Sequence, residues 1–198
     1  MAKTVILTGF MGTGKTAVGH EVARRLDVPF VDMDAEIEAR AGKPIPRIFS
    51  EDGETAFREM EAALIRDLSA SRDGWAELAA GAVIATGGGT LVDPDNLALM
   101  REHGTVICLD ADPDAILRRV GDGGHRPLLD VDDPRTEIER LQAARREAYL
   151  AIPWHVDTTG LAVHQVAARV MALAQAREVS VRHPNGRYQI RIGEGVRD

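Results

Sequence analysis

The sequence predicts an α/β protein whose main domain is built on a parallel five-stranded sheet. Short apolar runs alternate with amphipathic helical patterns, as parallel strands joined by helical crossovers require. The first apolar run ends in a glycine-rich loop followed directly by a helical pattern. With 198 residues, the chain lies within the roughly 100–200 residues typical of one domain. We expect residues 1–177 to form this domain and residues 178–198 to be a C-terminal extension.

The expected elements follow one another along the chain with short connections. Strands are predicted at 4–8, 29–32, 82–86, 105–109 and 155–158. Helices are predicted at 15–26, 33–41, 54–70, 94–102, 112–120, 134–150 and 161–177. Residues 121–133 are rich in glycine and aspartate without periodicity, which indicates a long loop of the kind that forms lids.

Composition and charge exclude several classes of protein. Hydrophobic residues make up 44% and charged residues 28% of the chain, as in globular domains. A net charge of −7 argues against binding of nucleic acid or anionic membranes. The N-terminus enters a strand directly, and no apolar run reaches the length of a membrane span, so a cytoplasmic protein is expected. Cys108, the single cysteine, lies in an apolar run and is expected to pack in the core.

The stretch TVILTGFMGTGKT at 4–16 predicts a phosphate-binding loop. Four residues separate Gly9 from Gly14, and Lys15 and Thr16 follow, so backbone N–H groups and the lysine can meet phosphate oxygens while the threonine hydroxyl faces magnesium. An ordinary strand-to-helix turn would not require Lys-Thr at this place. The predicted nucleotide-binding residues of this loop are Gly12, Thr13, Gly14, Lys15, Thr16 and Ala17.

Polar residues follow the ends of other strands, where ligands bind in α/β sheets. Asp32 and Asp34 follow the second strand, where one carboxylate can face a metal ion and the other a substrate hydroxyl, or either can cap a helix. Gly87-Gly88-Gly89 follows the third strand and is either a wall against which a polar ligand lies or a tight turn.

Basic residues on helices are ambiguous by themselves. Arg58 and Arg145 lie off the apolar stripes of their helices, which is also true of ordinary solvated arginines. No histidine pairs with another at metal-ligand spacing, so no metal cage is predicted. Magnesium bound by Thr16 and the nucleotide phosphates needs none.

Six motifs in this order make the chain resemble the shikimate kinase family along about residues 3–175. The motifs are GFMGTGKT at 9–16, VDMD at 31–34, GE-x-x-FR-x-x-E at 53–61, ATGGG at 85–89, RPLL at 126–129 and R-x-x-x-Y at 145–149. The resemblance implies a P-loop fold like that of nucleoside monophosphate kinases, with sheet order 2-3-1-4-5. It also implies a substrate-binding region at about 33–62 and an ATP-covering lid at about 121–133. The implied reaction is transfer of the γ-phosphoryl group of ATP to the 3-hydroxyl of shikimate.

The resemblance also assigns a role to each matching residue. Arg58 and Arg145 would hold the shikimate carboxylate, since guanidinium groups bind carboxylates in a bidentate manner. Asp34 would bind the ring hydroxyls and orient the attacking one, and Gly88 and Gly89 would offer backbone contacts. The remaining roles belong to the nucleotide side: Thr16 ligates Mg²⁺, Asp32 reaches it through water, Lys15 and Arg126 flank the transferring phosphoryl group, and Arg119 stacks on adenine.

Some positions depart from the family pattern. Pro44 and Pro46 precede the GE motif, so the helix there is expected to start late. Extra residues around 69–81 should lengthen a peripheral loop. Thr159-Gly160 stands where many relatives carry a further arginine, which leaves the adenine pocket the least defined part of the site.

Three other kinds of function compete with this prediction: a kinase of another metabolite, a GTPase switch or regulatory module, and a motor ATPase. A kinase of another hydroxylated metabolite, such as gluconate, would share the phosphate loop, but Arg58, the triple glycine and RPLL together argue against it. A GTPase switch or a nucleotide-binding regulatory module is permitted by the loop alone, yet neither Asn96 nor Asn185 stands in an Asn-Lys-x-Asp motif. A motor ATPase would want a glutamate after Asp110, where the chain has alanine.

Residues 178–198 alternate apolar and polar positions around Pro184-Asn185-Gly186, which predicts a β-hairpin. The segment RYQIRIGEGV also resembles the opening strand of 3-dehydroquinate synthase. The tail is therefore either a plain extension or the start of a fused domain. We expect the kinase domain itself to be a monomer.

Overall fold

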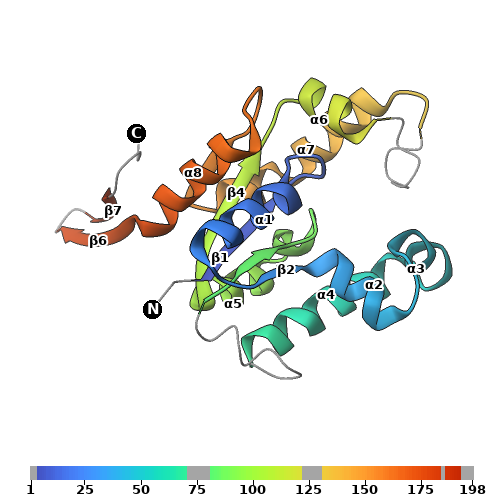
Figure 1. Cartoon of the computed structure of the whole chain (residues 1–198), viewed down its shortest axis with the longest axis horizontal. Coiled ribbons are helices and arrows are strands. Elements are labelled where there is room, and N and C mark those ends of the chain that lie inside the picture. The colour runs from blue at the N-terminus through green and yellow to red at the C-terminus, as the bar shows by residue number, and fades with distance from the viewer. Residues whose placement is uncertain (1–3, 71–80, 122–130, 184–185, 193–198) are drawn as a thin grey trace.

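The computed structural model describes residues 4–70, 81–121, 131–183 and 186–192, and its centre is a parallel five-stranded sheet (Figure 1). The strands lie in the order β2-β3-β1-β4-β5. Their bounds are Thr4–Gly9 for β1, Phe30–Asp32 for β2, Val83–Ala85 for β3, Gly104–Asp110 for β4 and Trp154–Asp157 for β5. The predicted strands and the order implied by the resemblance are confirmed, and the strand ends agree within one residue.

Helices connect the strands on both faces of the sheet. Their bounds are Lys15–Leu26 for α1, Met33–Ala41 for α2, Ile45–Glu51 for α3, Gly53–Ser69 for α4, Pro94–His103 for α5, Pro113–Val120 for α6, Pro134–Leu150 for α7 and Val163–Gln175 for α8. The long helices were predicted from their apolar stripes, and α6 and α7 also from their starts at Asp-Pro. The last one is shorter than the predicted 161–177, since its N-cap is Ala162 and strand β6 begins at Arg177.

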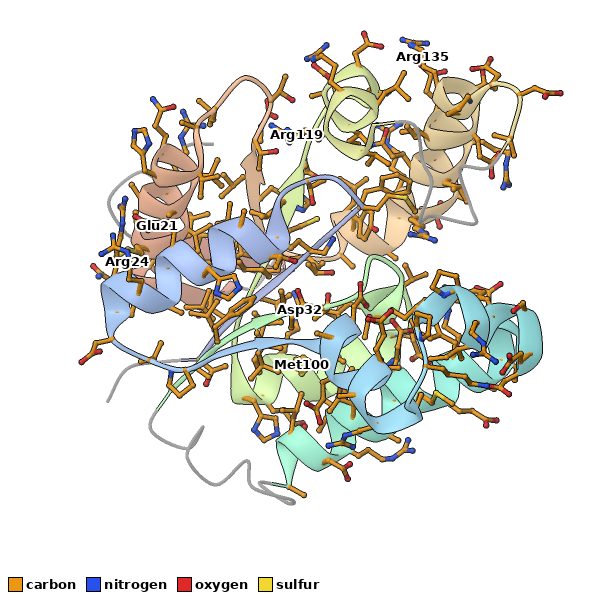
Figure 2. The ribbon with its side chains drawn as sticks, turned by 45° about the vertical axis from the view of Figure 1, so that its right-hand side comes forward. Glu21, Arg24, Asp32, Met100, Arg119 and Arg135 are labelled. Atoms are coloured by element: carbon orange, nitrogen blue, oxygen red, sulfur yellow. The ribbon has the colours of Figure 1, made fainter. Side chains whose placement is uncertain are left out.

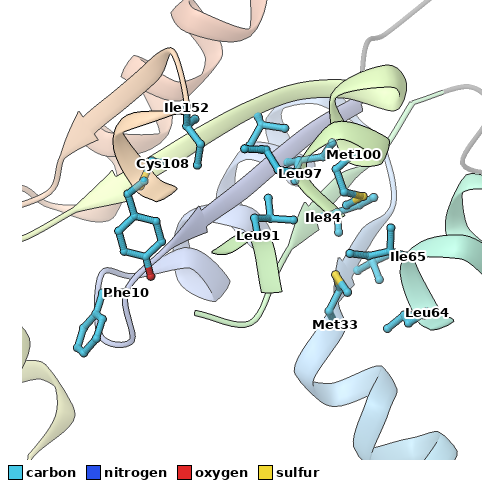
Figure 3. Close-up of a cluster of buried hydrophobic side chains, with 14 of the residues drawn as sticks. Phe10, Met33, Leu64, Ile65, Ile84, Leu91, Leu97, Met100, Cys108 and Ile152 are labelled. Atoms are coloured by element: carbon cyan, nitrogen blue, oxygen red, sulfur yellow. The ribbon is translucent and has the colours of Figure 1, made fainter. Parts of the chain in front are cut away.

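Alternating side chains of the strands build two apolar layers. Val5 and Leu7 of β1 point to one face, where α1 and α8 cover them with residues such as Val18 and Val170. Ile6 points to the opposite face, into a larger cluster formed with α4, α5 and α7. Figure 3 shows the part of this cluster that includes Met33, Leu64, Ile65, Ile84, Leu91 and Met100. The molecule therefore has three layers, with the sheet in the middle.

The short helix α3 was not assigned from the sequence beyond the expectation of a late start. It begins at Ile45, with Pro44 as the N-cap and Pro46 in its first turn. Proline is tolerated there because the first N–H groups of a helix have no intrahelical partner. A single 3₁₀ turn at Thr90–Val92, η2, was also missed, because three residues carry no periodic pattern.

The C-terminal tail forms the predicted hairpin. Strand β6 (Arg177–His183) pairs with β7 (Gly186–Ile192) in antiparallel register, with Val181 opposite Tyr188. Most of the predicted lid, residues 122–130, and most of the predicted peripheral loop, residues 71–80, lie outside the described part of the chain. Among the described helices, none combines the length and apolarity that crossing a bilayer demands.

Candidate active site

The carboxyl ends of the strands and the helices α1, α2, α4 and α7 surround one cavity of about 580 Å³. It brings together most of the predicted site residues that the structure describes. Its lining includes Gly12, Gly14, Lys15, Thr16, Ala17, Asp32, Asp34, Arg58, Gly88, Gly89, Arg119 and Arg145. Thr13 is not in the lining: it is 1% exposed and its hydroxyl donates to the carbonyl of Phe10 at 2.7 Å, which braces the loop from behind. Arg126 lies outside the described residues.

The loop between β1 and α1 has the geometry of a phosphate-binding loop. Gly14, the N-cap of α1, has a φ of 95°, which is strained for residues with a side chain. Gly14 has no side chain with which to cap α1, and Lys15, Thr16 and Ala17 of the first turn line the cavity. Lys15 Nζ donates to the carbonyls of Gly9 and Phe10 at 2.9 and 3.0 Å. Helix N-termini with such open amides attract anions.

Thr16 and Asp32 meet beside this loop. The Thr16 hydroxyl donates to Asp32 Oδ2 at 2.7 Å, while Asp32 Oδ1 accepts from the N–H groups of Asp34 and Ala35 at 3.1 and 3.4 Å. Asp32 is therefore the N-cap of α2 and also a residue of the cavity lining, while its role toward a metal ion stays a prediction. A hydroxyl and a carboxylate are the hard oxygen donors that Mg²⁺ prefers. The donor set thus fits the expected ion.

Arg58 extends from α4 into the cavity between two carboxylates. Its Nη1 donates to Glu61 Oε2 at 2.7 Å and its Nη2 to Glu54 Oε1 at 2.9 Å. Burial by itself would lower the pKa of Arg58, but the charge and the hydrogen bond of Glu61 raise it overall, so the guanidinium stays charged.

Glu61 stands in the GE-x-x-FR-x-x-E motif, but no role of its own was predicted for it from the sequence. It is 1% exposed, it accepts a very short hydrogen bond from the Thr90 hydroxyl, and its second oxygen holds Arg58. The signal was present, since Glu61 follows Arg58 by three residues on one helix and such residues are neighbours. Its burial could not be read from a charged residue type that is usually exposed.

The triple glycine passes close to side chains from two helices. The Gly88 carbonyl accepts from Arg145 Nη1 at 3.2 Å and from the Tyr149 hydroxyl at 2.5 Å. A Cβ at Gly89 would lie 2.6 Å from Arg58 Nη1, and one at Gly87 would lie 2.6 Å from Glu61 Oε1. The triple glycine is thus a closely packed backbone segment that also lines the cavity, and Arg58 and Arg145 both contact it. We call this segment the glycine wall. Burial raises the pKa of Tyr149 to about 12, so its hydroxyl remains a donor.

Arg119 lies on the nucleotide side of the cavity. Asp32 and Arg119 stand on either side of the N-terminal end of α1 (Figure 2). Arg119 donates to the carbonyl and the hydroxyl of Thr158 at 2.6 and 2.9 Å, and to the Gly12 carbonyl at 3.3 Å. These contacts connect α6, the end of β5 and the phosphate loop. Stacking of Arg119 on adenine stays a prediction.

Cys108 does not take part in the chemistry. Its side chain is fully buried, as expected, and burial raises the pKa of the thiol far above its usual range. The thiol therefore stays protonated and unreactive.

Together, the fold and the cavity define a class of protein. The cavity is lined by the N-terminus of α1 with Lys15 and Thr16, which is the arrangement that suits phosphate groups, and by two arginines beside the triple glycine, whose charge suits a small anion. This arrangement is that of a P-loop kinase of a small molecule.

Comparison with known proteins specifies the class further. The family model for shikimate kinase matches residues 11–175. The shikimate kinase of Pelotomaculum thermopropionicum is 41% identical over 169 residues, covering 85% of this chain and 94% of the relative. That of Desulforudis audaxviator is 45% identical over 175 residues, covering 88% of each. A shikimate kinase of Acinetobacter baumannii solved in complex with shikimate superposes with a TM-score of 0.78 at 31% identity, covering 86% of this chain and 92% of that one. The chain belongs to the shikimate kinase family.

Proposed function

We propose that the chain transfers the γ-phosphoryl group of ATP to the 3-hydroxyl of shikimate, giving shikimate 3-phosphate and ADP in the biosynthesis of chorismate and the aromatic amino acids. Family membership supports ATP as the phosphoryl donor. The observation that carries the substrate assignment is the convergence of Arg58 and Arg145 on the glycine wall, which lines the same cavity as the phosphate loop.

The two arginines supply the charge that an acidic protein needs to collect an anionic substrate. Arg58 and Arg145 bind the carboxylate of shikimate, and Gly88 and Gly89 contact the ring through their backbone. Arg145 also lies 5.5 Å from the centre of the Phe10 ring, which limits where its guanidinium can point. Asp34, at the start of α2, binds the ring hydroxyls and orients the 3-hydroxyl toward the nucleotide.

The nucleotide occupies the other end of the cavity. The loop residues 12–17 hold the phosphates, and Arg119 borders the adenosine side. Thr16 and, through water, Asp32 hold Mg²⁺, which neutralises phosphate charge when bound. Lys15 leaves the carbonyls of Gly9 and Phe10 to reach the transferring phosphoryl group, and the sequence resemblance gives Arg126 the opposite side of that group.

This arrangement needs no covalent intermediate, because phosphoryl transfer depends mainly on positioning and on stabilisation of charge. The hydroxyl of shikimate attacks the γ-phosphorus, the bond to the β-phosphate oxygen breaks, and the hydroxyl proton passes toward Asp34. The carboxylates of Glu54 and Glu61 hold Arg58 before the substrate arrives, so little reorganisation is required.

We assign the activity to residues 1–177, acting as a monomer in the cytoplasm where ATP is made and used. The tail, 178–198, contributes none of the assigned site residues. Two origins remain for it, a plain extension and the first strands of a fused 3-dehydroquinate synthase domain.

Release of ADP by the purified chain tests the function. Shikimate, quinate, gluconate and nucleoside monophosphates are offered separately with ATP and Mg²⁺. Shikimate alone is expected to give strong turnover. Equal turnover with gluconate, or none with shikimate, would refute the assignment.

A further inference from the structure

His155, on β5, contacts oxygen atoms with both of its ring nitrogens. Nδ1 lies 2.6 Å from Asp110 Oδ2, and Nε2 lies 3.0 and 3.2 Å from the carbonyl oxygens of Ile152 and Tyr149. Carbonyl oxygens only accept, so Nε2 must carry a proton to bond them. An ionised Asp110 carboxylate also only accepts, and a neutral imidazole has a single N–H, so with that carboxylate both sets of contacts are hydrogen bonds only when both ring nitrogens carry a proton.

The two carbonyls lie where α7 ends. Tyr149 is in the last turn of α7, and Ile152 follows Ala151, the C-cap of the helix. A cation is favourable at this position because the C-terminal carbonyls carry partial negative charge. The side chain of Tyr149 reaches the opposite way, to the Gly88 carbonyl at 2.5 Å, and Arg145 one turn earlier contacts the same atom at 3.2 Å. One helix end therefore connects His155 to the substrate wall, although His155 itself is not in the lining of the cavity.

We propose that His155, as an imidazolium ion paired with Asp110, is a positioning residue that fixes the end of α7 and thereby places Tyr149 and Arg145 on Gly88. The proposal rests on the proposed function, in which Arg145 binds the substrate carboxylate.

The charged and titratable groups around His155 come from several elements and are compatible with a protonated ring. Asp110 comes from β4, Tyr149 from α7, and Asp157 follows two residues later on β5. Cys108, also on β4, donates its thiol to Asp110 Oδ1 at 3.6 Å and stays neutral because burial raises its pKa. Arg101 of α5 donates to the Ala151 carbonyl at 3.0 Å, beside the same helix end.

These surroundings set the direction of the pH dependence. The hydrogen bond that His155 donates to Asp110 is the main cause that raises the pKa of His155, with burial acting against it and the two carbonyls adding to it. Because the folded pKa lies above the ordinary value of about 6.5, the positioning is complete below that value. It is lost as the pH rises through the raised pKa.

The protonation state is tested directly by NMR of the protein labelled with ¹⁵N in its histidines. The His155 resonances are assigned from their loss in His155→Gln. Both ring nitrogens are expected to keep their protons above the ordinary histidine value of about 6.5. A neutral ring at that pH would overturn the proposal.

The positioning role is tested by kinetics as a function of pH. His155→Gln, which cannot satisfy both sets of acceptors as a cation does, is expected to lower kcat/KM for shikimate by about tenfold while KM for ATP changes little, since small displacements of a substrate-orienting group are costly. His155→Arg stays charged and has several N–H donors, so it should keep most of the activity and lose the decline at alkaline pH. His164→Gln, on the exposed surface of α8, is the control.

A double-mutant cycle separates positioning from general stability. If His155 acts through α7, the losses for His155→Gln and Tyr149→Phe in kcat/KM for shikimate will not add, because one contact depends on the other. Additive losses, or equal losses for shikimate and ATP, would refute the role. A wild-type chain that phosphorylates no shikimate would instead refute the proposed function, so the two failures are distinguishable.

Discussion

Arg58 is held in place before any substrate is present. Glu61 below it is buried and fixed by Thr90, while Glu54 on the same helix is exposed and holds the guanidinium from the solvent side. A carboxylate ligand can displace Glu54 at small cost, because exposed ion pairs contribute little. The buried partner then remains as the support that keeps Arg58 directed into the cavity.

Arg58→Ala should therefore lower kcat/KM for shikimate by at least about tenfold, since a hydrogen bond to a charged group is worth about 1.5–3 kcal/mol. KM for ATP should change much less. The matched control is Arg66→Ala, an exposed arginine two turns further along α4. Steady-state kinetics with each substrate varied in turn measures both effects, and unchanged kcat/KM for shikimate would remove Arg58 from the carboxylate site.

Asp32 combines a structural and a functional task, and substitution can separate them. Asparagine caps helices about as well as aspartate, so Asp32→Asn should leave the free energy of unfolding within about 0.5 kcal/mol of the wild type. The variant has lost the charge that faces the metal, so half-maximal activity should need several times more Mg²⁺.

Asp93→Asn is the control for this substitution. Asp93 caps α5 through the N–H groups of Asp95 and Asn96 and is not in the lining of the cavity. Titration of activity with Mg²⁺ after treatment with EDTA distinguishes the two variants. The same Mg²⁺ dependence for both would show that Asp32 does not serve the ion.

Individual site residues could be predicted from the sequence where their residue types, in that pattern, have few possible functions. Lys15 and Thr16 after a glycine loop permit little besides phosphate binding, and the cavity contains both. Glu61 and Tyr149 were not assigned, because their importance comes from burial against Gly87 and Gly88, which are distant in sequence. His155 was missed for the same reason, since its partners lie on another strand and at a helix end.

Among the elements, the connection from β3 to η2 (Ala85 to Thr90) is closely packed. Gly87 faces Glu61, Asp34 and Thr90 so closely that an added Cβ would lie 2.6–2.8 Å from an oxygen of each. A methyl group there must push apart Asp34 and Glu61, the second of which holds Arg58. At Gly88 the nearest atoms would lie at 3.4 Å, which is a tolerable contact.

We therefore expect Gly87→Ala to lower the melting temperature by several degrees, because overpacking costs about 1–3 kcal/mol. Gly88→Ala should leave the melting temperature nearly unchanged. Thermal unfolding followed by circular dichroism compares the two. Equal melting temperatures would mean that the acidic side chains have room to move.

The elements also show what local pattern can predict. Strands buried on both faces appear as continuous apolar runs, and these were located within one residue. Helix α3 is seven residues long with a proline in its first turn, and its single buried residue is Ile48, so it had almost no apolar periodicity to reveal it.

For the whole molecule, the assigned site residues precede α8 along the chain, whereas the hairpin β6–β7 follows it. Isolated two-stranded hairpins are marginally stable in water. A chain that ends after Arg177 should therefore fold and keep essentially full turnover with shikimate. A folded product of this truncation with less than about half the wild-type kcat would show that the tail contributes to the site.

A second truncation, after Gly160, serves as the contrast. It removes α8, whose Val166, Ala167 and Val170 are buried against the sheet. The free energy of burial lost with such a cluster exceeds the free energy of unfolding of a typical domain, which is about 5–15 kcal/mol. This shorter chain should fail to give a cooperative unfolding transition in circular dichroism.

The two arginines that converge on the glycine wall come from different parts of the molecule. Figure 1 shows α4 beside α2 and α3 on one side, and α7 beside α6 on the other. A carboxylate bound by both guanidinium groups is then a reversible, non-covalent cross-link between these two parts. Its strength is set by the concentration of free ligand. When the metabolite is scarce, the two parts are joined mainly by the covalent chain and the shared core. Without bound ligand, the two parts therefore move most easily relative to each other.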